Sequence, residues 1–291
     1  MKQKTRNGKL IISTDGQERV LSFLYGNVLG RILLKPLTAP WISRLAGEML
    51  STRASCFLIN GFIKKNNIDM SQFESVKYRS YNDFFSRKIK PEVRPIDKEA
   101  HHLISPCDSK LTVMKITKDR RFRLKQTEYT VESLLKSFRL ASKYEGGYAM
   151  IFRLTVDDYH RYGYIADGKK GKNVKIPGVL HTVNPIANDY FPIYKENSRE
   201  YTIIRTREFG DVLMMEVGAL LVGKIVNHHE EAQVVRGQEK GYFQFGGSTV
   251  VVLLKENTVK IDSDILENSS QGIETVVKFG EKIGESCLTE K

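Results

Sequence analysis

The chain has 291 residues, of which 41% are hydrophobic, 10% aromatic and 27% charged. These proportions are typical of a folded globular protein and exclude a disordered chain, a collagen-like repeat and a disulfide scaffold. The net charge of +12 is uneven, because residues 1–90 hold 16 Lys and Arg against 6 Asp and Glu, whereas residues 248–291 hold 5 against 8. A basic N-terminal part suits a polyanionic partner, and nucleic acid, anionic lipid head groups and acidic proteins all qualify.

The most apolar early segment, residues 20–30, has eleven uncharged residues before Arg31 interrupts it. A bilayer crossing needs roughly 18–20 apolar residues, so we expect a chain that can lie on a membrane but does not span it. Cys56, Cys107 and Cys287 are too few and too scattered for a disulfide framework, and none belongs to a C-x-x-C pair. A reducing, cytosolic environment is the simplest interpretation.

Residues 20–67 show helical periodicity, since apolar residues recur at three- and four-residue spacings on either side of Pro36 and Pro40. Basic residues are interleaved among the apolar positions: Arg31, Lys35, Arg44, Arg53, Lys64 and Lys65. Helices of this kind bind membrane interfaces, because they combine apolar burial with attraction to anionic head groups. A helix whose apolar stripe packs on the protein's own core has the same pattern. Both interpretations remain open, and they can hold on different faces.

Residues 81–97, which end with Pro91 and Pro95, separate the helical part of the chain from a part with a different hydrophobic pattern. Short apolar or alternating runs follow it and predict strands at 148–156, 212–217, 220–226 and 249–254. A helical front followed by a run of strands indicates an α+β fold with a mainly antiparallel β core. We therefore predict a basic helical region over residues 1–95 and a β-rich core over residues 96–291.

Two motifs point only weakly to ligands. Residues 218–224 (GALLVGK) resemble a phosphate-binding loop, but Ile225 stands where a hydroxyl would bind Mg²⁺, and the intervening residues are all apolar. Residues 228–231 (HHEE) can bind a metal, yet a solvated polar turn after the preceding strand explains them more simply. We expect neither a nucleotide nor a metal site.

Asp108, His160 and Ser248 are the residue types that together activate a hydroxyl nucleophile. Taken singly, each has a structural interpretation: a turn at Asp108, a polar strand end at His160, and a tight turn before a strand at Ser248. Gly246 and Gly247 precede the serine. Because Gly247 has no Cβ, a nucleophile can approach its carbonyl closely.

In combination, the motifs resemble the phosphatidylserine decarboxylase family, whose members make a pyruvoyl cofactor by cutting themselves at a Gly-Ser bond. The matching segments cover roughly residues 80–255 in the family's order: YNDFFSRKIKPEVRPID, SPCDSKL, VDDYHRY, IPGVLHTVNP, FGDVLMMEVGALLVGKI and RGQEKGYFQFGGSTVVVLL. The Gly-Gly-Ser-Thr sequence is similar to the variant of the cleavage motif in which Gly replaces the commoner Leu.

The resemblance implies that Asp108 orients an imidazole, which takes the proton of Ser248 as its oxygen attacks the carbonyl of Gly247. Cleavage would then leave a β chain (1–247) and an α chain (248–291) that stay together as a heterodimer. Ser248 would become the pyruvoyl group, which forms a Schiff base with the substrate amine. No metal or diffusible cofactor is implied.

The sequence departs from the family at one position. Members commonly carry a second histidine three residues after the first, often assigned to the charge relay, but Gly163 stands there. His160 matches the first histidine and is the expected base, with His181 as a distant second candidate. The relay role then moves to His160, or self-cleavage is slow or needs another base.

The resemblance implies conversion of phosphatidylserine to phosphatidylethanolamine and carbon dioxide at an anionic phospholipid membrane. We expect a peripheral protein on the cytoplasmic side of the cell membrane, with no nucleic-acid partner and with higher oligomers left open. Two alternatives remain. One is a pyruvoyl decarboxylase of another amine, and the other is a processing-deficient, lipid-binding relative, motivated by Gly163.

Overall fold

The computed structural model describes residues 2–12, 18–124, 127–184, 187, 190–220, 224–244, 246 and 248–288. Its helices are α1 (Glu18–Gly26), α2 (Val28–Leu37), α3 (Pro40–Leu50), α4 (Phe57–Lys65), α5 (Tyr81–Phe85), α6 (Val131–Leu135), α7 (Phe138–Ala141), α9 (Ile193–Glu196) and α10 (Ser263–Ser270). Short 3₁₀ turns are η1 (Arg53–Cys56), η2 (Met70–Gln72), η3 (Pro91–Val93) and η4 (Ser142–Tyr144).

The strands of the N-terminal half are β1 (Lys2–Thr5), β2 (Leu10–Ile12), β3 (His102–Ile104), β4 (Ser109–Lys115), β5 (Arg121–Leu124), β6 (Thr127–Thr130) and β7 (Tyr148–Leu154). The middle of the chain adds β8 (Arg161–Gly163), β9 (Gly168–Lys170), β10 (Val174–Ile176), β11 (Arg199–Thr206), β12 (Gly210–Val217), β13 (Ile225–Asn227) and β14 (Ala232–Val234). The last strands are β15 (Glu239–Phe243), β16 (Ser248–Leu254), β17 (Val259–Ile261), β18 (Glu274–Val277) and β19 (Lys282–Ser286).

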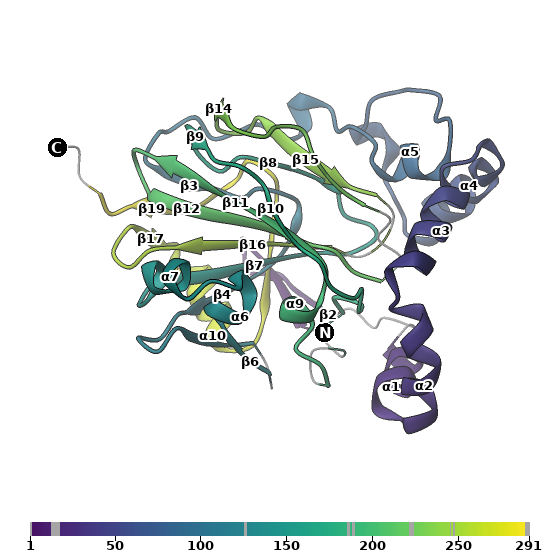
Figure 1. The fold of residues 1–291 in the computed structure, drawn as a ribbon. Coiled ribbons are helices and arrows are strands. Elements are labelled where there is room, and N and C mark those ends of the chain that lie inside the picture. The colour runs from purple at the N-terminus through teal and green to yellow at the C-terminus, as the bar shows by residue number, and fades with distance from the viewer. Residues whose placement is uncertain are drawn as a thin grey trace.

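A large sheet forms the centre of the protein (Figure 1). Among the described residues it has eleven strands, ordered β14-β9-β11-β12-β16-β7-β4-β18-β1-β2, with β10 paired to β11. Its strand pairs are antiparallel except β1 with β18. Central strands such as β16 (STVVVLL) are rich in β-branched residues and buried along their whole length. The predicted α+β fold with a mainly antiparallel core is confirmed.

The predicted strands at 148–156, 212–217 and 249–254 correspond to β7, β12 and β16. The predicted strand at 220–226 is shorter in the structure, where Ile225–Asn227 forms β13 and residues 221–223 lie outside the described part. Apolar runs of this length do not reveal where a strand begins, because pairing partners decide it.

A second, smaller sheet covers the face of the large sheet that carries Ser248. Side chains alternate between the faces of a strand, so Ser248 and Val250 of β16 point to the same face as Glu216, which lies opposite Val250. The smaller sheet has the order β13-β15-β8. Lys240 of β15 is fully buried, and its Nζ donates to Glu216 at 2.7 Å. Asn227 of β13 donates to the same carboxylate at 3.1 Å.

Helices α1 to α4, which we call the helical front, lie along one side of the β core (Figure 1). α5 joins them to the core through the buried rings of Tyr81, Phe84 and Phe85, against which Phe62 of α4 packs. Tyr25 attaches α1 to the core, because its buried hydroxyl accepts a hydrogen bond of 3.1 Å from the amide of Thr182. The helical front is therefore anchored at both ends.

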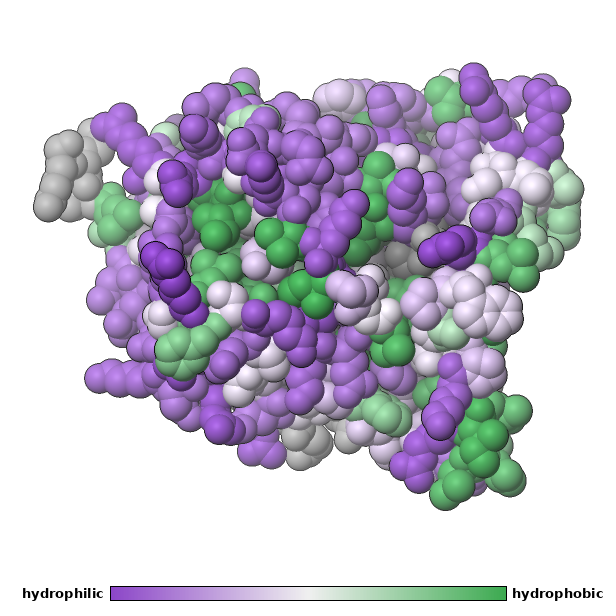
Figure 2. Space-filling model, viewed as in Figure 1, coloured by the Kyte–Doolittle hydropathy of each residue, from purple (hydrophilic) through white to green (hydrophobic). Residues whose placement is uncertain are grey.

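Most of the apolar stripe on these helices does not reach the core. Leu21, Tyr25 and Leu34 are buried. The exposed apolar residues form a set that we call the front stripe: Phe23, Val28, Leu29, Ile32, Leu33, Trp41, Leu45, Met49 and Phe57. Figure 2 shows the part of it over α1 and α2 as a hydrophobic area. One face of the front packs inward, while another presents large apolar side chains to solvent.

The first residues of the chain belong to the large sheet, so the helical part of the predicted 1–95 region begins at Glu18. Arg6 lies just after β1, and its Nη2 and Nε bind Asp262 and Asp264, each at 2.7 Å. Such a pairing between the two ends of a chain leaves no local sequence signal. Within the described residues, no helix is both long and apolar enough to cross a membrane.

The buried pair of Lys240 and Glu216 predicts a large effect on stability. Lys240→Met should lower the free energy of unfolding by about 3–5 kcal/mol, because it leaves a buried carboxylate without its charge partner. The double variant with Glu216→Leu should recover most of this loss. Urea unfolding followed by circular dichroism measures both.

Lys255→Met is the matched control, because the ion pair of Lys255 with Asp211 at 2.8 Å is partly exposed, at 32% and 26% of the two side chains. This variant should cost at most about 1 kcal/mol. Equal losses of unfolding free energy in the Lys240 and Lys255 variants would show that the buried pair between the sheets stabilises the fold no more than a partly exposed pair.

Candidate functional site

Asp108 and Ser248 lie at the same end of two central strands of the large sheet. Asp108 directly precedes β4, and Ser248 is the first residue of β16. β7 lies between these strands and pairs with both. Two strand spacings amount to roughly 10 Å. Two segments that are far apart in the sequence thus begin at the same end of the central strands, separated by two strand spacings.

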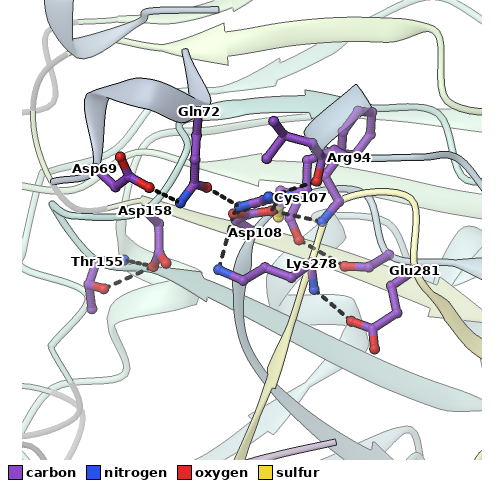
Figure 3. Close-up of polar contacts among 12 residues, drawn as sticks. Asp69, Gln72, Arg94, Cys107, Asp108, Thr155, Asp158, Lys278 and Glu281 are labelled. Carbon is purple, nitrogen blue, oxygen red and sulfur yellow. Dashed lines mark hydrogen bonds and ion pairs between the residues drawn. The ribbon is translucent and has the colours of Figure 1, made fainter. Parts of the chain in front are cut away.

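Asp108 is buried at the centre of a polar cluster (Figure 3). Arg94 donates to its carboxylate from Nη2 at 2.6 Å and from Nε at 2.9 Å. The backbone amide of Phe279 donates at 2.8 Å, and Nζ of Lys278 lies 3.3 Å away. Oε1 of Gln72 accepts a long hydrogen bond, 3.5 Å, from the same Nη2. The carboxylate is held in one orientation by donors from two segments.

These donors keep Asp108 ionised. Burial alone would raise the pKa of its carboxyl group. The hydrogen bond from Arg94, the charges of Lys278 and Arg94, and the amide of Phe279 outweigh burial and hold the pKa below its ordinary value. The site therefore contains a fixed negative charge at neutral pH.

His160 lies on the turn between β7 and β8 and is fully buried. Its Nδ1 lies 3.0 Å from the backbone carbonyl of Asp158. A carbonyl can only accept, so Nδ1 carries the hydrogen and Nε2 keeps its lone pair. The ring packs on Phe85, with 4.2 Å between the ring centroids. The basic nitrogen of the imidazole is therefore Nε2, and the ring is fixed.

Burial lowers the pKa of the His160 imidazole to about 3. The hydrogen bond to Asp158 and the charge of Asp157 oppose this shift, whereas the positive charges of Arg87 and Lys110 add to it. The ring is thus neutral at physiological pH. A general base must be in this state before it accepts a proton.

The hydroxyl of Ser248 is buried and makes no hydrogen bond to any residue that the structure describes, and the same holds for Nε2 of His160. Buried polar groups without partners are uncommon in proteins and often mark functional sites. Gly246 has φ +132°, a backbone conformation that favours glycine. Gly247, the other half of the predicted cleavage site, lies outside the described residues.

The three predicted residues are not joined by hydrogen bonds within the described part of the chain. The hydrogen bonds of Asp108 go to Arg94, Lys278 and Phe279, and the carbonyl of Asp158 orients the His160 ring. The roles of Asp108 as orienting group and of His160 as base remain predictions.

The structure gives a physical reason for Gly163. Its amide donates to the carbonyl of Pro106 at 2.9 Å, so it lies beside the segment that carries Asp108. A Cβ atom at this position would lie 2.7 Å from the ring of Phe279 and 3.0 Å from the carbonyl of Gln238. Phe279 thus fills the room that a larger side chain at 163 would need.

His181, the second candidate for the base, has structural contacts. Its Nδ1 lies 3.3 Å from the hydroxyl of Tyr25, and its ring stacks on Phe191 at 4.9 Å. Asn197 bonds to both its amide and its carbonyl, at 2.9 and 2.8 Å. These contacts attach α1 to the core.

The side chains of His228 and His229 also have polar partners. His228 Nε2 lies 2.6 Å from Glu239, and His229 Nδ1 lies 3.2 Å from the hydroxyl of Tyr164. In the described part of the chain, no three His, Cys, Asp or Glu side chains gather as metal ligands would. Of the loop-like motif at 218–224, residues 221–223 lie outside the described residues.

Sequence reasoning missed the residues that hold the site together. Arg94 lies inside the quoted segment 81–97, but its role depends on a carboxylate fourteen residues later. Lys278 and Phe279 follow β18 and belong to no motif. The carbonyl of Asp158 carries no side-chain signal at all.

Comparison with known proteins gives a consistent result. A family model described as phosphatidylserine decarboxylase matches residues 81–285. A protein of Clostridium acetobutylicum named phosphatidylserine decarboxylase proenzyme 2 is 49% identical over 267 residues, which cover 91% of each chain. A protein of Clostridium botulinum named phosphatidylserine decarboxylase proenzyme is 38% identical to this chain, over 96% of this chain and 97% of the relative. A protein of the same name from Ruminiclostridium cellulolyticum is 39% identical, over 94% of this chain and 93% of the relative. On this evidence and on the matching segments, the chain belongs to the phosphatidylserine decarboxylase family.

Proposed function

We propose that this protein is a phosphatidylserine decarboxylase that cuts its own chain between Gly247 and Ser248. It would use the resulting pyruvoyl group to convert phosphatidylserine into phosphatidylethanolamine and carbon dioxide. The observation that carries the proposal is the Ser248 hydroxyl, which is buried at the start of β16 without a hydrogen bond to any described residue. Relatives of this chain are named proenzymes, in keeping with maturation by cleavage.

The surroundings of residue 248 suit a pyruvoyl group. The group would be the first unit of the 248–291 chain, held by β16 between β7 and β12. Ser248 is fully buried, so this position is shielded from bulk solvent. When formed, the group supplies a ketone that condenses with the substrate amine and withdraws the electrons left by the departing carboxylate.

The chain's own residues account for the cleavage. The Ser248 hydroxyl attacks the carbonyl of Gly247 and gives up its proton to Nε2 of His160. The peptide bond becomes an ester, which eliminates to free the carboxyl end of residue 247. Loss of ammonia by hydrolysis then leaves the ketone at residue 248. The negative charge of Asp108 stabilises the imidazolium that forms while His160 carries the proton.

The fold supports a heterodimer of the two products. β16 lies between β7 and β12, and β18 lies between β1 and β4. Strands of the 248–291 part are thus interleaved with strands of the 1–247 part in one sheet. Cutting one peptide bond leaves these ladders intact, so the two chains stay together after cleavage.

Mass spectrometry of the purified protein tests the cleavage. The intact masses should be those of chains 1–247 and 248–291, the latter without a free amino group. Ser248→Ala removes the nucleophile and should leave one uncut chain. Thr249→Val is the matched control, because Thr249 carries the neighbouring buried hydroxyl but points to the other face of β16, and it should still be cut. Wild-type protein that stays uncut and inactive contradicts the proposal.

The pH dependence of cleavage tests the state of His160. With a pKa of about 3, the imidazole stays neutral at pH 5, so the cleavage rate of freshly translated chain should change little between pH 8 and pH 5. An ordinary imidazole, with a pKa near 6.5, would be about 3% neutral at pH 5, and cleavage would be about thirtyfold slower.

The cleaved fraction is followed by mass at each pH. Circular dichroism of the uncut Ser248→Ala chain shows whether the fold persists at pH 5. A thirtyfold fall in a folded protein would mean that another group, or a solvated His160, is the base.

We further propose that the helical front binds an anionic phospholipid surface, on the cytoplasmic side of the cell membrane. The front stripe exposes large apolar residues such as Trp41, at 62%, and Leu29, at 66%. Arg31, Lys35 and Arg44 lie on the same helices, α2 and α3. Apolar insertion combined with attraction to anionic head groups is the basis of interfacial binding.

Vesicle flotation tests this docking. Replacing Leu29, Ile32 and Trp41 together by Ser should strongly reduce binding to vesicles that contain phosphatidylserine, while cleavage remains complete. Val235→Ser is the control, because Val235 is 61% exposed but lies on the β core. Binding of wild-type protein should weaken with added salt, because part of the attraction is electrostatic. Unchanged flotation of the triple variant would rule out the front stripe as the docking surface.

One observation favours a second candidate function. Gly163 and the Phe279 ring occupy the place where the family's second histidine is expected. A relative that binds lipid but does not process itself would float with vesicles while remaining uncut. Carbon dioxide release from phosphatidylserine, compared with release from free amino acids, separates the proposed substrate from another amine.

A further inference from the structure

Arg87 is a buried cation that the proposed cleavage does not use. It follows α5, is 2% exposed, and its guanidinium lies over the rings of Phe73 and Phe84, at 4.2 and 4.9 Å from their centroids. Its Nη1 makes one long hydrogen bond, 3.5 Å, to the carbonyl of Phe84. Its Nε and Nη2 make no hydrogen bond to any described residue. Buried charged donors without acceptors require an explanation.

The two free donors form the edge of the guanidinium that binds carboxylates elsewhere in this protein. Arg94 binds Asp108 through Nε and Nη2, at 2.9 and 2.6 Å. Arg153 binds Glu274 through the same two atoms, at 2.8 and 2.5 Å. This fork matches two oxygens of a carboxylate or a phosphate. Arg87 presents the same edge, and no carboxylate of the described chain binds it.

Arg87 is close to the expected reaction centre. The ring of Phe85, two residues earlier, packs 4.2 Å from the ring of His160. The carbonyl of Ser86 accepts a hydrogen bond from Nε of Arg161 at 2.7 Å, next to the histidine in the sequence. Burial lowers the pKa of Arg87 only to about 10, so the side chain stays charged at neutral pH.

A basic hollow of about 470 Å³ lies on the helical front near Arg87, and it is lined by Arg53, Cys56, Lys77, Tyr78 and Arg79. None of its three cations forms an ion pair with a residue that the structure describes. Tyr78 connects the hollow with Arg87, because its ring packs 5.3 Å from the ring of Phe84, on which Arg87 also lies. The buried Tyr78 hydroxyl has no hydrogen bond among the described residues.

We propose that Arg87 binds an oxyanion of the substrate head group through Nε and Nη2. The head group of phosphatidylserine offers two such oxyanions, the phosphate and the carboxylate. The hollow beside Tyr78 provides the approach from the membrane side. This inference rests on the proposed function, because it assigns a residue to that substrate. Arg87 takes no part in self-cleavage.

Kinetics of the processed enzyme on phosphatidylserine in mixed detergent micelles test the inference. Arg87→Gln should be cut completely, and its KM should rise about tenfold or more. Arg87→Lys keeps the charge but loses the two-pronged edge, so its KM should lie between those of the wild type and Arg87→Gln.

Arg199→Gln is the matched control. Arg199 is also 2% exposed, and burial lowers its pKa to about 10 as well. Each of its three side-chain nitrogens donates a hydrogen bond, at 2.8, 2.8 and 3.1 Å, to the carbonyls of Leu134, Asn197 and Ser133. Its loss should lower stability and leave KM unchanged.

Inhibition by glycerophosphoethanolamine, which has the phosphate but no carboxylate, assigns the oxyanion. If Arg87 binds the phosphate, the inhibition constant rises together with KM in Arg87→Gln. If it binds the carboxylate, KM rises alone. Either result supports the inference.

A wild-type KM in Arg87→Gln overturns the inference. So does a failure of both Arg87 variants to be cut while Arg199→Gln is cut, because Arg87 would then serve the fold. A wild-type chain that is not cut, or that releases no carbon dioxide, contradicts the proposed function itself and is seen before any variant is made.

Discussion

The exclusion of water from the space between the two sheets is the constraint on which the rest of the site depends. β16 lies in the middle of the large sheet and is buried along its length, and the β13-β15-β8 sheet closes over the face that carries Ser248. Lys240 and Glu216 bridge the two sheets without any exposure. Their attraction is strong because no water screens it, and the same dryness keeps the imidazole of His160 neutral. The interface that stabilises the fold thus also sets the protonation state of His160.

Three buried side chains of this protein, Asp108, His160 and Arg87, carry different charges. Asp108 is anionic because Arg94 and the Phe279 amide bind it, whereas His160 is neutral because it is buried. Arg87 is cationic, and its Nε and Nη2 have no hydrogen-bond partner among the described residues. The protein thus holds a buried anion, a buried neutral imidazole and a buried cation. This arrangement suits a reaction that moves a proton and then releases a carboxylate as a neutral molecule.

The helical front and the β core are joined at a few aromatic contacts, and these contacts lie next to the site. Phe85 packs on His160, and the α5 rings pack on α4 through Phe62. The front stripe on α1 to α4 faces solvent, while the opposite side of α1 reaches the core through Tyr25. The exposed apolar surface and the buried residues around His160 are therefore connected through a few aromatic rings. Residues 1–90, which include the helical front, carry 16 Lys and Arg against 6 Asp and Glu.

Hydrophobic periodicity alone established the helices at 20–67, the central strands and the α+β class, because alternation and helical spacing record which side chains must be buried. The order of motifs established the family and pointed to Asp108, His160 and Ser248. The sequence was silent on Arg94, Lys278 and Phe279 around Asp108, on the Asp158 carbonyl that orients His160, and on the strand formed by Lys2–Thr5. These depend on contacts between segments far apart in the chain, for which local pattern carries no information. Whether a guanidinium is bound by a carboxylate, as Arg94 is and Arg87 is not among the described residues, is decided only when the chain folds and removes water from both.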